Sequence, residues 1–587
     1  MRLTCVAFAD ELGIRIGIHS GQCIAGVIAG EKSRFQVFGE TRNVAMALEV
    51  TSMKNKIQIS KSTADLLREA GMANLLSPRE NLVYCKGWGE IQTFWVVGCP
   101  KQESTNPKSH AESGHSHEVT DDTEDLRQES KSLGLDESKS DIWENGDFVL
   151  LDPPRTFENE KLSRLIDWHV ECMIRLLKQI VASRGRECIN YHFTRANLAA
   201  CIESTTNNGT ILQELKEVIA LPKFDPELLK KVADPESILL DGVVVSQLRD
   251  YVTKIALLYR PNPFHNFEHA SHVTMAVHKF LARIVTPDDI DYGRKNVSEI
   301  ASDLHDYTFG IISDPLTHFA ILFSALVHDV DHRGISNAQL AREKPEISQL
   351  YMNQSIAEQH SVRLAWNLLM EPCYIDLQRC IFRNQTELLR FRQIVVNSVL
   401  ATDMLDVESK ALRNLRWDKA FHPERHHPKP SLDGTSIDGL QGVESLKLIE
   451  TNRRATVVIE HLIQAADIVH AMQCWQVYKE WNERQFHEMY IAYQAGRSDS
   501  DPCVCWYINE MSFFNDFVIP LAEKLEECGV FGVASDECLL NAIENRREWE
   551  AKGKFIAAEM VSKCKKLHPV VAPARASLLH ENLDKQD

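Results

Sequence analysis

The sequence predicts a large all-α domain with a small α/β unit in front of it, and three observations carry this prediction. From residue 150 to about 568, apolar residues recur with the 3.6-residue period of helices, and proline and glycine fall mainly at the breaks. Residues 1–99 instead interleave short strand-like runs with helix-like ones. Residues 101–142 hold five Lys or Arg against eleven Asp or Glu without apolar periodicity, which predicts a solvated acidic linker.

Individual elements follow from the same patterns. In the α/β unit we expect three strands, with one helix over residues 43–49 between the first two. In the all-α domain, a stretch rich in Pro, Gly, Asp and His predicts a surface loop over residues 422–442. The expected strands are 14–19, 56–60 and 93–97, and the clearest helical stretches are 162–181, 238–258, 317–327, 356–369, 389–400 and 456–481.

Composition excludes several classes of protein. The chain has 587 residues, 44% hydrophobic and 25% charged, which is ordinary for a soluble globular protein of three or four domain-sized units. Its net charge of −18 disfavours nucleic-acid partners, and no apolar run reaches the length of a membrane span. The 15 cysteines are scattered and odd in number, which predicts free thiols and a cytoplasmic setting.

The densest chemistry lies in the all-α part. His265 and His269 are four residues apart, which predicts that they share one helix face. About sixty residues on, an apolar helical run leads into four ionisable residues within five positions, among them His328, Asp329 and His332. Burying such charges costs several kcal/mol each unless they are paired or bound to metal. Histidine with carboxylate is the ligand set of zinc and similar divalent ions.

A further acidic candidate is Asp467, a lone charge after an apolar helical run. Taken alone, it would be interpreted as a helix-terminal or paired aspartate. His332, Glu358 and His360 could likewise each be ordinary helix residues.

Six segments, taken together, resemble a known family. In order along the chain, they look like the signature set of class I 3′,5′-cyclic-nucleotide phosphodiesterases, and the similarity covers roughly residues 160–565. The resemblance implies an all-α, HD-type catalytic domain with a two-metal centre that hydrolyses cyclic nucleotides, cGMP or cAMP, in signal transduction. The segments are 264–270, 328–337, 355–360, 400–404, 465–467 and 509–520.

The resemblance also implies roles for individual residues. One metal, usually zinc, would be held by four ligands, and Asp329 would bridge to a second, usually magnesium (or manganese). Two such cations would generate a hydroxide at neutral pH. His265 would protonate the departing 3′-oxygen, and His332, Glu358 and His360 would order the metal waters. The four implied ligands are His269, His328, Asp329 and Asp467.

The implied nucleotide pocket departs from the family pattern. Glu510 stands where members have a glutamine that contacts the purine edge, and Phe513 matches the stacking ring. His470 occupies a pocket position where asparagine is common. An ionised glutamate only accepts hydrogen bonds, which favours the adjacent donors of guanine. A protonated Glu510 would lose this discrimination, and a Glu510 turned away to a salt bridge would select nothing.

Residues 12–98 resemble the second half of a class III adenylate/guanylate cyclase domain, which implies a partial α/β, ferredoxin-like fold. The matching stretches are 12–21, 38–45 and 86–89. Asn43 matches a transition-state asparagine, but Ala47 stands where an arginine is expected and Gln36 at the purine-selecting position. The aspartates that bind metal in such cyclases belong to a half not seen here, so we expect no cyclase activity.

These patterns predict four regions: a partial cyclase domain over 1–99, an acidic disordered linker over 100–145, a phosphodiesterase domain over 146–570, and a disordered tail over 571–587. A homodimer or a cyclase partner through residues 1–99 stays open, as does the cytosolic part of a longer membrane protein. Three alternative functions also stay open: an HD-type phosphohydrolase on ordinary nucleotides, a fragment of a receptor-type cyclase whose role is cyclisation, and a non-catalytic nucleotide-binding module.

Overall fold

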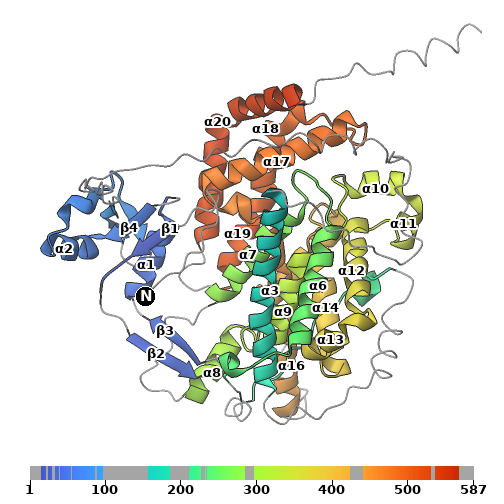
Figure 1. Ribbon diagram of the computed structural model, residues 1–587, viewed down its shortest axis with the longest axis horizontal. Coiled ribbons are helices and arrows are strands. Elements are labelled where there is room, and N and C mark those ends of the chain that lie inside the picture. The colour runs from blue at the N-terminus through green and yellow to red at the C-terminus, as the bar shows by residue number, and fades with distance from the viewer. Residues whose placement is uncertain are drawn as a thin grey trace, which may run out of the picture.

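The structure is a computed structural model, and it combines a large helical domain with a small unit of strands and helices, as Figure 1 shows. Both parts of the predicted fold class are therefore confirmed. The predicted linker (100–145) and tail (571–587) lie outside the described residues. The structure describes residues 15–21, 24–29, 33–38, 40–53, 56–85, 89–96, 157–184, 210–225, 232, 234–284, 297–423, 440–530 and 536–567.

Helix α9 (Pro315–Val327) is the centre of the helical domain, because every one of its residues is buried. A helix that is apolar all round must be covered on every side. Helices α3 (Phe157–Ser183), α7 (Phe267–Arg283) and α14 (Gln385–Ala401) pack directly against it. The carboxyl end of α9 is therefore held inside the core, and the next residues are His328 and Asp329.

The other helices complete this core. Helices α17, α18, α19 and α20 form a second group at the carboxyl end of the chain, drawn in orange and red in Figure 1. The bounds are α6 (Gly242–Leu258), α8 (Val297–Tyr307), α10 (Asn337–Glu343), α11 (Pro345–Leu350), α12 (Ile356–Leu369), α13 (Ile375–Ile381), α15 (Val407–Phe421), α16 (Leu440–Asp467), α17 (Trp475–Gln494), α18 (Pro502–Phe513), α19 (Ile519–Glu527) and α20 (Glu537–Leu567).

The amino-terminal unit is built on a four-stranded mixed sheet in the order β1-β4-β8-β5, with β1 (Arg15–Ile18) parallel to β4 (Lys56–Ser60). Helix α1 (Glu40–Val50) packs on these two strands. Gly17 permits this contact, because a Cβ there would lie 2.4 Å from the carbonyl oxygen of Ala45. The other elements are β2 (Ile24–Ala29) paired with β3 (Ser33–Phe38), α2 (Lys61–Glu69), β5 (Leu76–Pro78), β6 (Val83–Cys85) paired with β7 (Gly89–Ile91), and β8 (Thr93–Val96).

One expected helical stretch is divided in the structure. The apolar period over 456–481 belongs to two helices, because α16 ends at Asp467 and α17 begins at Trp475, with a 3-10 turn, Val469–Met472, between them. The expected 422–442 loop falls mostly on residues outside the described part of the chain. Among the described residues, no helix combines the length and apolarity needed to cross a bilayer.

Candidate metal centre and active site

Two predicted histidines lie at the amino-terminal end of α7, but not on one helix face. Asn266 is the N-cap of this helix and its side chain accepts a hydrogen bond from the His269 backbone N–H at 3.0 Å. Only His269 is therefore helical, and His265 lies in the loop before the cap. The predicted shared helix face is wrong for this pair, because the asparagine starts the helix between the two histidines.

A second correction concerns the segment after α9. The helix ends at Val327, so His328 caps it and His332 lies in the following turn instead of on the same face. Nδ1 of His328 lies 2.9 Å from the carbonyl oxygen of Ala325, and an N–H donated there makes Nε2 the unprotonated nitrogen. Asp331 in the turn has φ +63°, a left-handed conformation that aspartate tolerates better than most residues.

The four predicted metal ligands converge. Nε2 of His269 lies 3.0 Å from Oδ1 of Asp467 and 3.7 Å from Oδ2 of Asp329. Nε2 of His328 lies 3.2 Å from Oδ2 of Asp329 and 3.4 Å from Oδ1 of Asp467. These residues come from α7, the end of α9 and the end of α16, so that three helices position one cluster.

The chemistry of this cluster fits a divalent cation. Both histidines are buried, and Nε2 of His328 has no hydrogen bond although it faces two carboxylates. Burial raises the pKa of Asp329, but His328 beside it outweighs burial and holds the pKa well below its usual range. An unprotonated imidazole nitrogen and two ionised carboxylates are what a bound metal requires.

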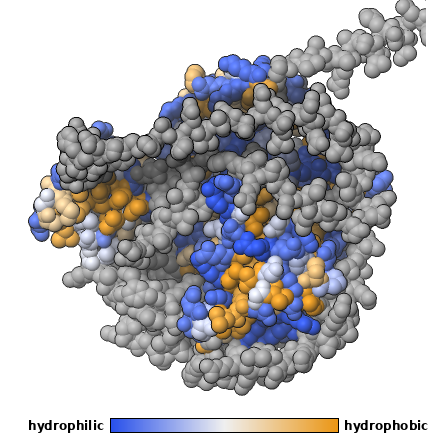
Figure 2. Space-filling model, viewed as in Figure 1, coloured by the Kyte–Doolittle hydropathy of each residue, from blue (hydrophilic) through white to orange (hydrophobic). Residues whose placement is uncertain are grey.

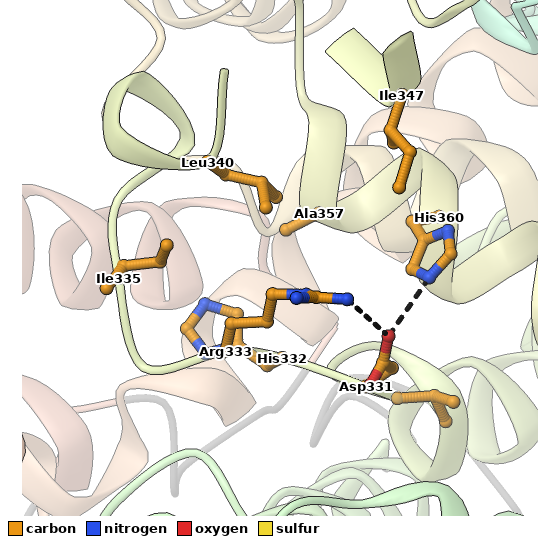
Figure 3. A pocket seen from close by; sticks show the side chains of 9 residues that line it. Asp331, His332, Arg333, Ile335, Leu340, Ile347, Ala357 and His360 are labelled. Carbon is orange, nitrogen blue, oxygen red and sulfur yellow. Dashed lines mark hydrogen bonds and ion pairs between the residues drawn. The ribbon is translucent and has the colours of Figure 1, made fainter. Parts of the chain in front are cut away.

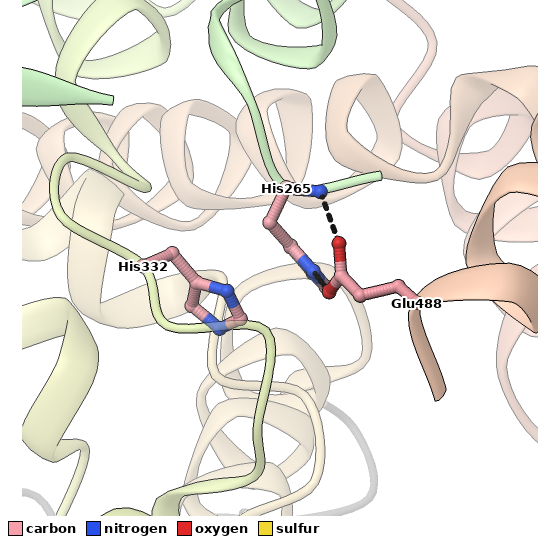
Figure 4. A group of neighbouring side chains, drawn as sticks. All are labelled: His265, His332 and Glu488. Atoms are coloured by element: carbon pink, nitrogen blue, oxygen red, sulfur yellow. Dashed lines mark hydrogen bonds and ion pairs between the residues drawn. The ribbon is translucent and has the colours of Figure 1, made fainter. Parts of the chain in front are cut away.

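His265 is paired with Glu488 of α17 beside the four ligands (Figure 4). One carboxylate oxygen accepts from Nδ1 of His265, and the other accepts from the backbone N–H groups of His265 and Phe264, at 2.9 Å each. Burial lowers the pKa of His265, but Glu488 raises it to about 9 overall. The imidazole is therefore protonated at neutral pH and can act as a general acid.

Glu488 is a functional candidate that sequence reasoning missed. It is 6% exposed, and it follows Trp481 by seven residues and precedes Ala492 by four on α17, so all three share one buried helix face. A carboxylate on such a face was the available signal, since acidic side chains are rarely buried without a partner. Its partner His265 lies 223 residues away, beyond any local pattern.

His332 stacks against His265, with ring centroids 4.0 Å apart. The two rings and Glu488 are near enough to form a second candidate metal group. However, all the hydrogen bonds of Glu488 go to His265 and Phe264, which leaves this carboxylate occupied. Burial, together with the charge of His265, lowers the pKa of His332 to about 4, so its ring is neutral. We therefore interpret the group as a proton-donating pair with a neutral neighbour.

Asn262 ties the two histidine-bearing loops together and was also missed. Its side-chain amide donates to the carbonyl oxygen of His265 at 2.9 Å and to that of His332 at 2.7 Å. Gly334 lies next to this amide with φ +65°, and a Cβ there would meet both Asn262 and Glu488 at 3.4 and 3.3 Å. The bond between the loops fixes where the proton donor stands.

His360 and Glu358 of α12 have partners other than the four ligands. Nε2 of His360 lies 3.1 Å from Oδ2 of Asp331, in a pocket of about 360 Å³ between the 330–335 turn and α10–α12 (Figure 3). Glu358 accepts from Asn337 at 3.0 Å. Burial, with Asp403 nearby, raises the pKa of Glu358 to about 8. Their predicted role in ordering metal waters stays a prediction.

Glu510 lies on α18 and is 5% exposed. The hydroxyl of Tyr478 donates to its Oε2 at 2.8 Å, and Asn482 also bonds its carboxylate. Asn482 is oriented by the indole N–H of Trp506, which donates to its Oδ1 at 3.1 Å. Burial raises the pKa of Glu510 to about 7. Both partners are neutral, so the salt bridge considered for Glu510 is not the arrangement found.

The other two predicted pocket residues differ in their surroundings. Phe513 ends α18 and is half-buried, with its ring stacked 6.0 Å from that of Phe517 in a π-helical turn, Phe514–Val518. His470 is buried beside Phe264 and Trp481, with centroids 5.6 and 6.2 Å away. Burial lowers the pKa of His470 to about 3, so its ring is neutral.

Asn43, the residue predicted from the cyclase resemblance, lies within α1, where its side chain is outside the described part. Ala47 is one turn further along the same helix.

The fold and these contacts define a helical protein with a buried histidine–carboxylate metal centre. Residues 264–529 match the family described as 3′5′-cyclic nucleotide phosphodiesterase, and residues 3–98 match the adenylate and guanylate cyclase catalytic domain. The chain thus carries a cyclic-nucleotide phosphodiesterase catalytic domain preceded by a segment of the nucleotide cyclase family. Enzymes of the phosphodiesterase family are metal-dependent, in agreement with the candidate ligand groups found here.

Curated relatives divide between the two parts. A probable 3′,5′-cyclic-AMP phosphodiesterase, pde-4 of Caenorhabditis elegans, is 26% identical over 312 residues, which is 52% of this chain and 39% of that protein. A dual specificity calcium/calmodulin-dependent phosphodiesterase 1B of Rattus norvegicus is 25% identical over 231 residues, 39% of this chain and 32% of that one. Guanylyl cyclase C of the same species is 39% identical over 94 residues, 16% of this chain and 9% of that protein.

Among solved structures, the phosphodiesterase domain of a rhodopsin–phosphodiesterase fusion from Salpingoeca rosetta is similar at 21% identity, with a TM-score of 0.39. The similarity covers 64% of this chain and 95% of that one. This chain spans well under half the length of the curated relatives that it matches.

Proposed function

We propose that this chain hydrolyses the 3′-ester of 3′,5′-cyclic nucleotides to give 5′-nucleoside monophosphates. The observation that carries the proposal is the convergence of two histidines and two aspartates directly beside the His265–Glu488 pair. A metal centre next to a protonated imidazole is the combination that phosphodiester hydrolysis requires. The match of residues 264–529 supports the same reaction class.

Zinc suits the cluster of His269, His328, Asp329 and Asp467, because imidazole and carboxylate are its common ligands. Magnesium or manganese suits a second position that shares Asp329, because these ions prefer oxygen. When bound, the two cations lower the pKa of water and neutralise negative charge on the phosphoryl oxygens. The buried, unpaired Nε2 of His328 supports this assignment.

His265 is the proposed proton donor to the leaving 3′-oxygen. Its pKa of about 9 keeps the ring protonated at neutral pH, and Glu488 holds the ring through Nδ1, which leaves Nε2 for the substrate. The neutral ring of His332 packs on one face, and Asn262 fixes the loop behind it. The proton therefore has a defined position before substrate arrives.

For the base, we propose that Glu510 and Phe513 recognise the purine and that ionised Glu510 favours guanine. The two residues are three apart on α18 and so lie on neighbouring positions of its surface. Tyr478 and Asn482 hold the Glu510 carboxylate in one orientation. Because adenine offers only one donor at this edge, an acceptor-only carboxylate would discriminate against it.

The proposal also includes the division of the chain at residues 1–99, 100–145, 146–570 and 571–587. The nine cysteines described with their side chains are all free thiols, which supports a reducing compartment such as the cytosol. Two other functions remain as outcomes of a test. A phosphohydrolase would act on linear nucleotides only, and a binding module would turn over neither.

The decisive experiment uses the full chain as purified, with cyclic AMP, cyclic GMP, and the corresponding 5′-monophosphates and triphosphates as separate substrates. We expect hydrolysis of the cyclic compounds only, lost on chelation and restored by Zn²⁺ with Mg²⁺. Release of phosphate from linear nucleotides without cyclic turnover would favour the phosphohydrolase. Tight nucleotide binding without turnover, in protein with full metal content, would favour the binding module.

A further inference from the structure

The cyclase-like unit meets the phosphodiesterase domain at a cluster of five charged side chains, here called the interdomain charge cluster. Two members come from the unit, Arg15 of β1 and Glu49 of α1, and three come from the helical domain, Lys279 and Arg283 of α7 and Glu537 of α20. Figure 1 shows the unit lying alongside the helical domain.

The contacts cross between the two parts in both directions. Arg15 lies 3.1 Å from Glu49 and 3.5 Å from Glu537, so it joins its own unit to α20. Arg283 lies 3.4 Å from Glu49 and also pairs with Glu537, so it joins α7 to both. Lys279 lies 3.6 Å from Glu537. Each carboxylate therefore has cations from both sides of the boundary.

Burial distinguishes this cluster from ordinary surface ion pairs. The side chains of Glu537, Arg283 and Arg15 are 7, 14 and 17% exposed. A pair such as Arg175–Glu171 on α3 has both side chains more than half exposed and contributes little. Charges withdrawn from water are costly without their partners, so each member favours the arrangement that supplies the others.

The two helix ends in the contact suit these charges. Arg283 is the last residue of α7, where a cation is favoured, and Glu537 is the first residue of α20, where an anion is favoured. A second contact supports the same placement, because β2 of the unit lies against α8 of the helical domain.

The unit's own core gives a reason for docking. Its described core cluster contains only Ile59, Ala64 and Phe94 as buried members. A small domain buries too little apolar surface to be very stable alone. Contact with a larger neighbour adds stability that such a core lacks.

From these observations we infer that the cyclase-like unit is docked on the phosphodiesterase domain through the interdomain charge cluster and bears on the helix that holds His269. His269 and Arg283 are 14 residues apart on α7, about 21 Å at 1.5 Å per residue. The unit is thereby an interaction surface for the phosphodiesterase domain itself. A partner that uses the β1–α1 side of the unit must compete with α7 and α20 for it.

Hydrogen exchange of the full chain tests the docking. Glu537→Gln removes the central carboxylate, and Arg15→Met removes a cation from outside the helical domain, so its effect cannot come from misfolding of that domain. The matched control is Glu544→Gln, on the same helix as Glu537 but paired only with exposed Arg547. Exchange is followed in residues 40–50 of α1 and in residues 315–327 of α9.

We expect both test variants to speed exchange in residues 40–50 by about tenfold or more, with α9 as protected as in the parent chain. The control should leave both segments unchanged. A rise below twofold in either test variant would overturn the inference, and so would an equal rise in the control. The outcome does not depend on hydrolysis, so it stands or falls separately from the proposed function.

Discussion

The four proposed metal ligands carry an unbalanced charge. Asp329 and Asp467 both have pKa values held well below the usual range despite burial, because His328 lies between them. If both imidazoles give up their Nε2 lone pairs, two buried negative charges remain without a cation. A divalent ion removes that cost, and its loss should restore it.

Replacing either His328 or Asp467 by alanine should therefore abolish hydrolysis and tight metal binding together. Each substitution removes a ligand atom and the geometry that orients the others. Metal content by elemental analysis and turnover of cyclic GMP check this. Asp306→Ala is the matched control, because Asp306 belongs to the chain's other His-Asp dipeptide and is exposed on α8. An Asp467→Ala protein with full metal and full activity would contradict the site.

His265 should show a different pattern from the ligands. His265→Ala should keep its metal and lose about 10²–10⁴-fold in rate, the range of a positioned general acid. Glu488→Gln should keep more activity but shift its pH dependence. The acid form of His265 is lost as pH rises through its pKa of about 9, and without the Glu488 charge that pKa falls. The alkaline limb of kcat/KM should therefore move to lower pH.

The control for Glu488→Gln is Glu483→Gln on the same helix, where the carboxylate is paired with exposed Lys563. This variant should keep the alkaline limb of the parent. An unshifted limb in Glu488→Gln would separate Glu488 from the proton donor.

Glu510 makes base preference depend on pH. Burial raises its pKa to about 7, so the carboxyl is neutral below that value and ionised above it. The ratio of kcat/KM for cyclic GMP over cyclic AMP should rise, on the order of tenfold, as pH passes from 6 to 8, because a hydrogen bond to a charged group is worth about 1.5–3 kcal/mol. Glu510→Gln should flatten this dependence, whereas Glu523→Gln, exposed on α19, should not. Equal, pH-independent preference in the parent chain would exclude the assignment.

At the scale of elements, the start of α7 positions both histidines. The Oδ1 of Asn266 caps the helix, while its amide donates to the carbonyl oxygens of Asn262 and Pro263 at 2.7 and 3.3 Å. Asn266→Ala should lower the free energy of unfolding by about 1 kcal/mol and also lower kcat. Asn266→Asp keeps the cap but not the amide donors. Comparing the two by urea denaturation and turnover separates helix stability from loop position.

Local periodicity predicted whole helices well, and it failed where a side chain ends or starts one. The expected helix over 356–369 is α12 with the same bounds, because its apolar period runs unbroken to Leu369. His265 was misplaced because the Asn266 cap starts α7 one residue later. The break after Asp467 was missed because the apolar period resumes with nearly the same phase in α17. Glu488 needed a tertiary contact, which no local pattern contains.

At the scale of the whole molecule, two parts with different chemistry share one chain. The helical domain contains the four convergent ligands, while the described residues of the cyclase-like unit include no such group. Sequence comparison alone predicted this division, because residues 3–98 and 264–529 match different families. The contact between them could not be predicted, since Arg15 and Glu537 are 522 residues apart.

The cyclase-like unit should therefore not make cyclic nucleotides in this chain. Ala47 of α1 has no charge to stabilise a transferring triphosphate, and the 587 residues here lack a matching aspartate-bearing half. The test must prevent loss of product, because the proposed phosphodiesterase would consume it. We would supply Mn²⁺ with GTP or ATP to the Asp467→Ala chain and measure both cyclic nucleotide and pyrophosphate, with an active cyclase as a positive control. We expect neither product. Equal formation of the two would show cyclisation and contradict the prediction.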